Sequence, residues 1–92
     1  MCRAHIYYEG RVQGIGFRYT AERLALERGL QGWVKNLQDG RVEVVCEGSK
    51  DRIEVFLREI AGGDLGAYIR KATCSWEPPT GGFRDFCIEY CL

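Results

Sequence analysis

Three glycines and one arginine near the start of the chain form a pattern that can hold an anion. Residues 10–18 read Gly-Arg-Val-Gln-Gly-Ile-Gly-Phe-Arg. Because glycine tolerates positive φ and has no side chain, the backbone N–H groups of such a segment can converge on one point. Arg18 adds a planar, permanently charged guanidinium that fits phosphate oxygens. The pattern predicts capture of a phosphoryl group by backbone amides and one guanidinium.

The segment does not match the common nucleotide-binding motifs. A P-loop has Gly-Lys-Ser/Thr after its glycines, whereas residues 16–18 read Gly-Phe-Arg. The dinucleotide fingerprint is Gly-x-Gly-x-x-Gly, and the spacing here is Gly-x-x-x-Gly-x-Gly. The sequence also has no cluster of carboxylates placed to hold magnesium. We therefore expect an anion site that uses neither a nucleotide nor a metal ion.

The elements that must position this segment follow from the spacing of apolar residues. Helical spacing predicts one helix over residues 17–28, with Gly29 at its C-terminal end, and a second helix from Ser49 to Gly62. The Pro-Pro-Thr-Gly-Gly segment at residues 78–82 predicts a loop. Alternating or extended patterns predict five strands, at residues 3–9, 32–36, 41–47, 68–77 and 83–90.

The order of these elements is β-α-β-β-α-β with an extra strand near the end. It predicts an α+β fold, a ferredoxin-like split βαβ sandwich with a mainly antiparallel sheet and two helices packed on one face. Asp39-Gly40 favours a tight hairpin turn between the two central strands. In this topology the segment 10–17 and Asn36 can meet. The 92 residues allow one modest core, and we expect a single domain over residues 1–92.

Two long segments resemble the two signatures of the acylphosphatase family. The first is residues 10–18, and the second is residues 32–44, Gly-Trp-Val-Lys-Asn-Leu-Gln-Asp-Gly-Arg-Val-Glu-Val. Glu47-Gly48 is also usual in that family, and Ile15 stands where valine is common. The resemblance covers essentially the whole chain. It implies an enzyme that hydrolyses the carboxyl–phosphate anhydride of acyl phosphates to a carboxylate and inorganic phosphate.

The resemblance also implies roles for individual residues. Arg18 would hold the phosphoryl group of the substrate, and Asn36 would position the attacking water through its side-chain amide. The loop would bind the phosphate, or an inorganic phosphate or sulfate ion, through residues that share one short segment: Gln13, Gly14, Ile15, Gly16, Phe17 and Arg18. A carboxylate leaving group, of pKa about 4, needs little protonation. Positioning and charge stabilisation then suffice, so no metal, cofactor or covalent nucleophile is expected.

Composition excludes several other classes of protein. Thirteen basic residues balance thirteen acidic ones, so no strong field attracts nucleic acid or a membrane. The N-terminus lacks the apolar core of a signal peptide, and no apolar run approaches the roughly 18 residues that a membrane span needs. We expect a cytoplasmic monomer whose partner is a small-molecule acyl phosphate. Neither nucleic acid nor a membrane is an expected partner.

The five cysteines and the single histidine are expected to be structural. The cysteine count is odd and no Cys-x-x-Cys pair occurs, which argues against a secreted disulfide framework and against a metal site. Buried or half-buried thiols are the favoured interpretation, and a bridge between Cys2 and Cys46 across two strands stays open. His5 is expected to be structural, on the open face of the sheet.

Two alternative functions stay open at this point. The RNA-recognition motif has the same order of elements, but it needs aromatic residues where residues 41–47 carry two acids and none. The other alternative is a non-catalytic anion sensor, or a counterpart of the acylphosphatase-like domains that open larger hydrogenase-maturation proteins. We expect a standalone enzyme.

Overall fold

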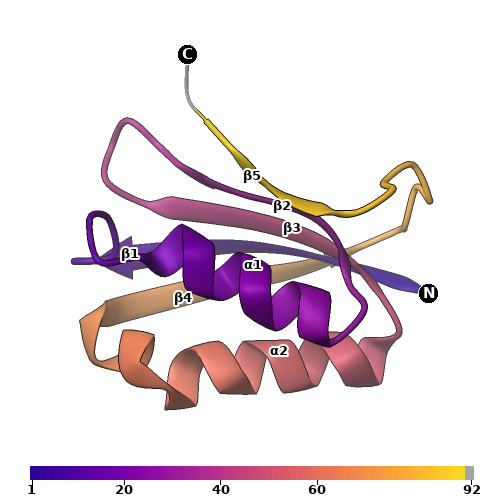
Figure 1. Cartoon of the computed structure of the whole chain (residues 1–92), viewed down its shortest axis with the longest axis horizontal. Helices are drawn as coiled ribbons and strands as arrows, with labels where there is room; N and C mark the ends of the chain where they lie inside the picture. The colour runs from indigo at the N-terminus through magenta and orange to yellow at the C-terminus, as the bar shows by residue number, and fades with distance from the viewer. Residues whose placement is uncertain (91–92) are drawn as a thin grey trace.

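A five-stranded sheet carries two helices on one face in the computed structural model, which describes residues 1–90 (Figure 1). The strand order is β4-β1-β3-β2-β5. All pairings are antiparallel except that of β2 with β5. The elements in chain order are β1 (Cys2–Gly10), α1 (Phe17–Glu27), β2 (Gln31–Asn36), β3 (Val42–Gly48), α2 (Lys50–Gly62), the 3₁₀ helix η1 (Asp64–Tyr68), β4 (Ile69–Glu77) and β5 (Phe86–Glu89). The predicted ferredoxin-like α+β fold is confirmed.

The core lies between the sheet and the helices. Alternate residues of each central strand point to the helical side, as a period of two requires. On β1, Ala4, Ile6 and Tyr8 are buried, while the residues between them are half-buried. The helices close this layer with residues at helical spacing, among them Phe17, Ala21 and Leu24 of α1 and Ile53, Phe56 and Ile60 of α2. This apolar layer fixes α1, and therefore the loop before it, against β2 and β5.

The hairpin between β2 and β3 is present, but its turn differs from the prediction. Asn36 pairs with Val42, so five residues form the loop in place of a tight turn. Among the turn residues only Gly40 takes positive φ, at 97°, because no non-glycine residue in the described chain does so. The Leu37 N–H donates to the carbonyl of Arg41 at 2.8 Å and closes the longer loop.

The segment before β4 also differs, since residues 64–68 form a 3₁₀ helix that the apolar pattern did not indicate. Its anchors are the buried side chain of Leu65 and the carbonyl of Tyr68, which accepts from the Arg11 N–H at 3.0 Å. Gly10 approaches the same carbonyl so closely that a Cβ atom there would lie 2.3 Å from the oxygen. These contacts fix the end of β1, where the glycine-rich segment begins.

The four described cysteines carry free thiols, so the Cys2–Cys46 bridge is not formed. Cys46 lies opposite Ala4, whereas Cys2 lies opposite Gly48. Cys91 lies outside the described residues. On the face away from the helices, the ring nitrogens of His5 contact the carboxylates of Glu43 and Glu77, as expected for a structural histidine. No helix in residues 1–90 is long and apolar enough to cross a membrane.

Candidate active site

The residues between β1 and α1 form a glycine loop, defined here as residues 11–16. Gly14 and Gly16 take φ values of 80° and 78°, in the left-handed region that favours glycine. Gly16 is also the N-cap of α1, so the chain passes directly from the loop into the helix. Glycines with positive φ directly before a helix are compatible with an anion nest, in which successive backbone N–H groups converge on one point.

The N-terminus of α1 lacks the capping side chain and the acidic first-turn residue that α2 has. In α2 the Ser49 hydroxyl accepts from the Arg52 N–H at 3.3 Å, and Asp51 lies in the first turn. In α1 no side chain caps the first N–H groups, and the first turn contains no acid. The first N–H groups of a helix have no acceptor within the helix and form its positive end. The start of α1 therefore suits an external anion.

A hollow of about 190 Å³ joins the glycine loop to β2. The predicted catalytic residues Arg18 and Asn36 both line it, although they come from α1 and β2. The other residues of its wall belong to the loop and the first turn of α1: Val12, Gly14, Gly16, Phe17 and Tyr19. The fold thus brings together the two residues that the sequence pattern placed 18 positions apart.

Arg18 is half-buried, and its guanidinium carbon lies 5.1 Å from the centre of the Tyr90 ring. Within residues 1–90 no carboxylate lies within ion-pair distance of this guanidinium. A ring against the flat face of a guanidinium leaves the N–H donors in its plane open to other groups. Arg18 is therefore held by an aromatic contact that does not neutralise its charge.

Two residues of the predicted phosphate-binding segment face elsewhere. Ile15 lines a different and larger groove, between α1 and α2. The side chain of Gln13 donates to backbone carbonyls of the β2–β3 hairpin. Any part that these two residues play in anion binding would come from their backbone N–H groups.

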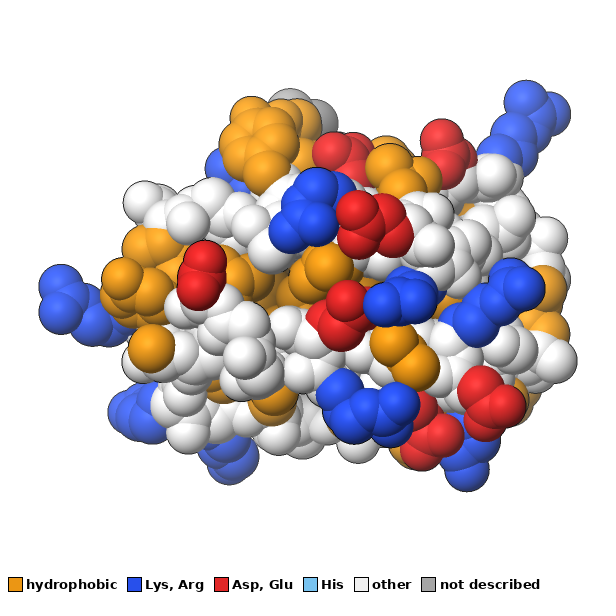
Figure 2. Space-filling model, turned by 60° about the horizontal axis from the view of Figure 1, so that its bottom comes forward, with side chains coloured by type: hydrophobic (Ala, Val, Ile, Leu, Met, Phe, Trp, Pro, Cys, Tyr) orange, Lys and Arg blue, Asp and Glu red, His pale blue; other side chains and the backbone are white. Residues whose placement is uncertain are grey.

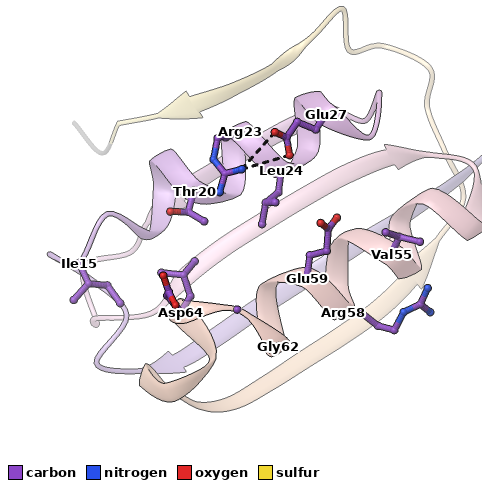
Figure 3. Close-up of a pocket in the computed structure, with 12 residues that line it drawn as sticks. Ile15, Thr20, Arg23, Leu24, Glu27, Val55, Arg58, Glu59, Gly62 and Asp64 are labelled. Atoms are coloured by element: carbon purple, nitrogen blue, oxygen red, sulfur yellow. Dashed lines mark hydrogen bonds and ion pairs between the residues drawn. The ribbon is translucent and has the colours of Figure 1, made fainter.

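The groove between α1 and α2 has a volume of about 760 Å³ and is larger than the hollow at Arg18. Figure 3 shows Arg23 joined to Glu27, while Glu59 points from α2 toward α1. Glu59 also accepts from Arg28 at 2.7 Å. Three of the charged side chains that line the groove, Arg23, Glu27 and Glu59, therefore have ion-pair partners. Figure 2 shows basic and acidic side chains interspersed over the helical side of the molecule. We therefore place the candidate site in the smaller hollow.

The pattern in the sequence did not single out Tyr19 and Tyr90. Their exposed rings lie beside the hollow, and a hydrogen bond with Tyr19 raises the pKa of the Tyr90 phenol. Tyr90 reaches this position because β5 runs parallel to β2, with Glu89 opposite Lys35. The position of Tyr19 directly after Arg18 could have indicated that Tyr19 lies near the site. No sequence pattern indicates the parallel pairing of β5 with β2, so Tyr90 could not be found in this way.

Proteins that resemble this chain along its length include acylphosphatases. The acylphosphatase family model matches residues 4–88. An acylphosphatase of Roseiflexus sp. (strain RS-1) is 43% identical over 88 residues, which cover 96% of this chain and 95% of that protein. The crystal structure of acylphosphatase from Bacillus subtilis is 36% identical, with a TM-score of 0.91, and the match covers 98% of this chain and 100% of that one.

A larger protein contains the same fold. The structure of T. kodakarensis HypF is 37% identical with a TM-score of 0.82, but the match covers 97% of this chain and only 12% of that one. The relative from Roseiflexus and the structure from Bacillus subtilis, by contrast, match over nearly their whole length. With a family model that spans residues 4–88 and relatives of this similarity, the chain belongs to the acylphosphatase family, whose enzymes hydrolyse acyl phosphates.

Proposed function

We propose that this chain cleaves acyl phosphates in the hollow between the glycine loop and Asn36. Membership of the family supports the reaction. The observation that carries the choice of site is that Arg18, the uncapped start of α1 and Asn36 surround one hollow. The backbone N–H groups of residues 13–18 and the Arg18 guanidinium bind the phosphoryl oxygens. The positive charge of Arg18 and the partial positive charges of the N–H groups stabilise the negative charge that spreads over these oxygens in a loose transition state.

Asn36 positions the water that attacks phosphorus. Its side-chain amide can accept from the water and donate to a phosphoryl oxygen. As the bond from phosphorus to the water oxygen forms, the bond to the acyl oxygen breaks and the electron pair leaves with the carboxylate. A phosphoryl oxygen takes the proton of the water. The carboxylate, a weak base with a pKa near 4, needs no general acid.

The proposal requires no metal ion, because Arg18 and the loop amides provide the positive charge that a metal would provide elsewhere. Hydrolysis of an aryl acyl phosphate in excess EDTA is therefore expected to proceed at the rate measured without the chelator. Recovery of a lost rate on adding Mg²⁺ would count against a site built only from Arg18 and backbone amides.

Substitution of Arg18 tests the binding half of the site. Arg18→Ala is expected to lower kcat/KM by about 100-fold or more, as the removal of an oxyanion donor does. Arg23→Ala is the matched control, since Arg23 belongs to the same helix but pairs with Glu27 beside the larger groove. Wild-type turnover by Arg18→Ala would refute the assignment.

Substitution of Asn36 tests the other half. Asn36→Ala is expected to lower kcat while leaving inhibition by inorganic phosphate nearly unchanged, because its partner in the proposal is the water. Lys35→Ala serves as the control on the same strand, where its ammonium lies 4.0 Å from Glu43 on the opposite face. Equal losses of kcat and of phosphate affinity would instead make Asn36 part of the anion-binding site.

Hydrolysis of an aryl acyl phosphate by the wild type also distinguishes an enzyme from an anion sensor. An enzyme releases one phosphate for each acyl phosphate lost and does so repeatedly, whereas a sensor leaves the ligand intact. The geometry does not favour RNA binding, because β3 presents Glu43 and Glu47 on the face where an RNA-recognition motif would stack bases.

A further inference from the structure

The side chain of Gln13 connects the glycine loop to the hairpin that carries Asn36. Its Nε2 donates to the carbonyl of Leu37 at 2.7 Å and to the carbonyl of Arg41 at 2.9 Å. A primary amide has two N–H donors, and both are used here. Gln13 precedes Gly14 of the hollow, and Leu37 follows Asn36. The hydrogen bond to Leu37 therefore joins the two walls of the hollow at the residues next to Gly14 and Asn36. The bond to Arg41 reaches the residue before Val42, which pairs with Asn36.

The two acceptors are also the residues that close the hairpin loop. The Leu37 N–H donates to Arg41 at 2.8 Å, and the Gly40 N–H donates to Leu37 at 3.2 Å. The Gln13 amide thus adds two donors to carbonyls that already hold the ends of the turn together. Without it, the five-residue loop would depend on its own hydrogen bonds alone, and the end of β2 would have more freedom.

We propose that Gln13 is a positioning residue that sets the distance from the glycine loop to Asn36. The proposal rests on the function proposed above, in which Asn36 holds the water and the glycine loop holds the phosphoryl group. Effective water attack needs the two groups in register to within about half an ångström. The two short hydrogen bonds from Gln13 to the carbonyls of Leu37 and Arg41 hold the glycine loop and the end of β2 in that register. Gln13 itself need not touch the substrate through its side chain.

The two hydrogen bonds of Gln13 act as a clamp between the glycine loop and the hairpin. Gln13→Met tests this clamp, since methionine has a similar length and no donor. We expect kcat to fall roughly 10-fold, which corresponds to the loss of two net hydrogen bonds. The inhibition constant of inorganic phosphate should change less than about threefold, because Arg18 and the loop amides remain. Gln38→Met, at an exposed position of the same turn, is the matched control and should keep the wild-type kcat.

A double-mutant cycle with Asn36→Ala shows whether Gln13 acts through Asn36. If it does, Gln13→Met lowers kcat in the wild-type background and has almost no further effect in Asn36→Ala. The same fold loss in both backgrounds would overturn the proposal, since Gln13 would then act on the glycine loop or on overall stability. Midpoints of urea unfolding for all four proteins identify a stability effect.

Amide hydrogen exchange gives a second measurement that does not depend on residual activity. Exchange at the N–H groups of Leu37 and Gly40 should be faster in Gln13→Met than in wild type, and unchanged in Gln38→Met. Unchanged exchange in Gln13→Met would overturn the clamp. The two proposals fail separately: no hydrolysis by the wild type refutes the proposed function, whereas wild-type kcat in Gln13→Met, with an active wild type and a slow Asn36→Ala, refutes only the clamp.

Discussion

Single residues of the glycine loop set its shape through their backbone angles. Gly16 has φ of 78°, and a Cβ atom there would meet no atom within 4 Å. Replacement by alanine would therefore strain the backbone of residue 16, because its φ is positive, but would cause no steric clash. Because the loop opens directly into α1, any relaxation of that strain would turn the first N–H groups of the helix away from their present direction. The requirement for glycine at this position is conformational.

Gly16→Ala is accordingly expected to lower the free energy of unfolding by about 1–2 kcal/mol, the cost of left-handed backbone in an L-residue. Turnover should fall as well, because the N–H groups of the loop move. Gly62→Ala is the matched control: Gly62 is helical, lacks positive φ and has open space around its Cβ position. Alanine there should raise stability by up to about 1 kcal/mol. Urea unfolding of both variants measures the two changes in the free energy of unfolding. Equal changes would contradict the explanation that positive φ makes alanine unfavourable at position 16.

At the scale of the elements, the predictable parts are those with strong local patterns. The alternation of β1 and the helical spacing of α1 and α2 fixed these elements nearly to the residue. The 3₁₀ helix and the short β5 depend on distant contacts, such as the bond from Arg11 to Tyr68 and the pairing of β5 with β2. Spacing alone does not encode contacts of this kind.

The candidate site divides in the same way. Arg18 and Asn36 were found because their motifs are continuous in sequence, and the topology then predicted that they could meet. The contacts of Gln13 with the hairpin and of Tyr90 with Arg18 could not be predicted, since each depends on where a side chain points after folding. The roles of Arg18 and Asn36 in catalysis stay predictions until the substitutions above are measured.

The connection between β4 and β5 is fastened by one buried carboxylate on β3. Glu47 accepts from the Thr80 N–H at 2.8 Å, the Thr80 hydroxyl at 3.1 Å and the Gly81 N–H at 2.9 Å. Its side chain is fully buried, and Arg3 lies 3.4 Å away. Burial alone would raise the pKa of Glu47, but these donors and Arg3 hold the net pKa below its usual value. The ionised form is thus stabilised in the folded state.

A lowered pKa has a definite sign for stability. The contribution of Glu47 is present above the unfolded-state pKa, about 4.3, and is lost as the pH falls through the lower folded-state value. Glu47→Gln should lower the free energy of unfolding at pH 7 by about 1–3 kcal/mol, since it leaves buried donors poorly matched. It should also flatten the loss of stability in acid. Urea unfolding at pH 7 and below pH 4.5 measures both, with exposed Glu54→Gln as the control. Parallel pH profiles for Glu47→Gln and wild type would contradict this account.

For the whole molecule, Cys46 can report on unfolding. It lies fully buried on β3, the middle strand of the sheet, and burial raises the pKa of its thiol to about 12. Alkylation needs an accessible thiolate, so at pH 8 Cys46 should react only when the sheet opens. The exposed thiols of Cys74 and Cys87 provide an internal comparison. Peptide mass spectrometry after iodoacetamide treatment distinguishes the sites.

The same thiol tests whether the proposed anion site is coupled to folding. A ligand that binds only the native state lowers the unfolded population by the factor 1 + [L]/Kd. Inorganic phosphate at ten times its Kd should therefore slow alkylation of Cys46 about tenfold, provided that refolding is faster than alkylation. Cys46 does not line the hollow, so the ligand cannot shield it directly. Arg18→Ala should lose most of this protection, whereas Arg23→Ala should keep it. If phosphate slows alkylation equally in wild type and Arg18→Ala, the anion binds elsewhere. If wild-type Cys46 reacts faster than the chain unfolds, the sheet opens locally between β1 and β3.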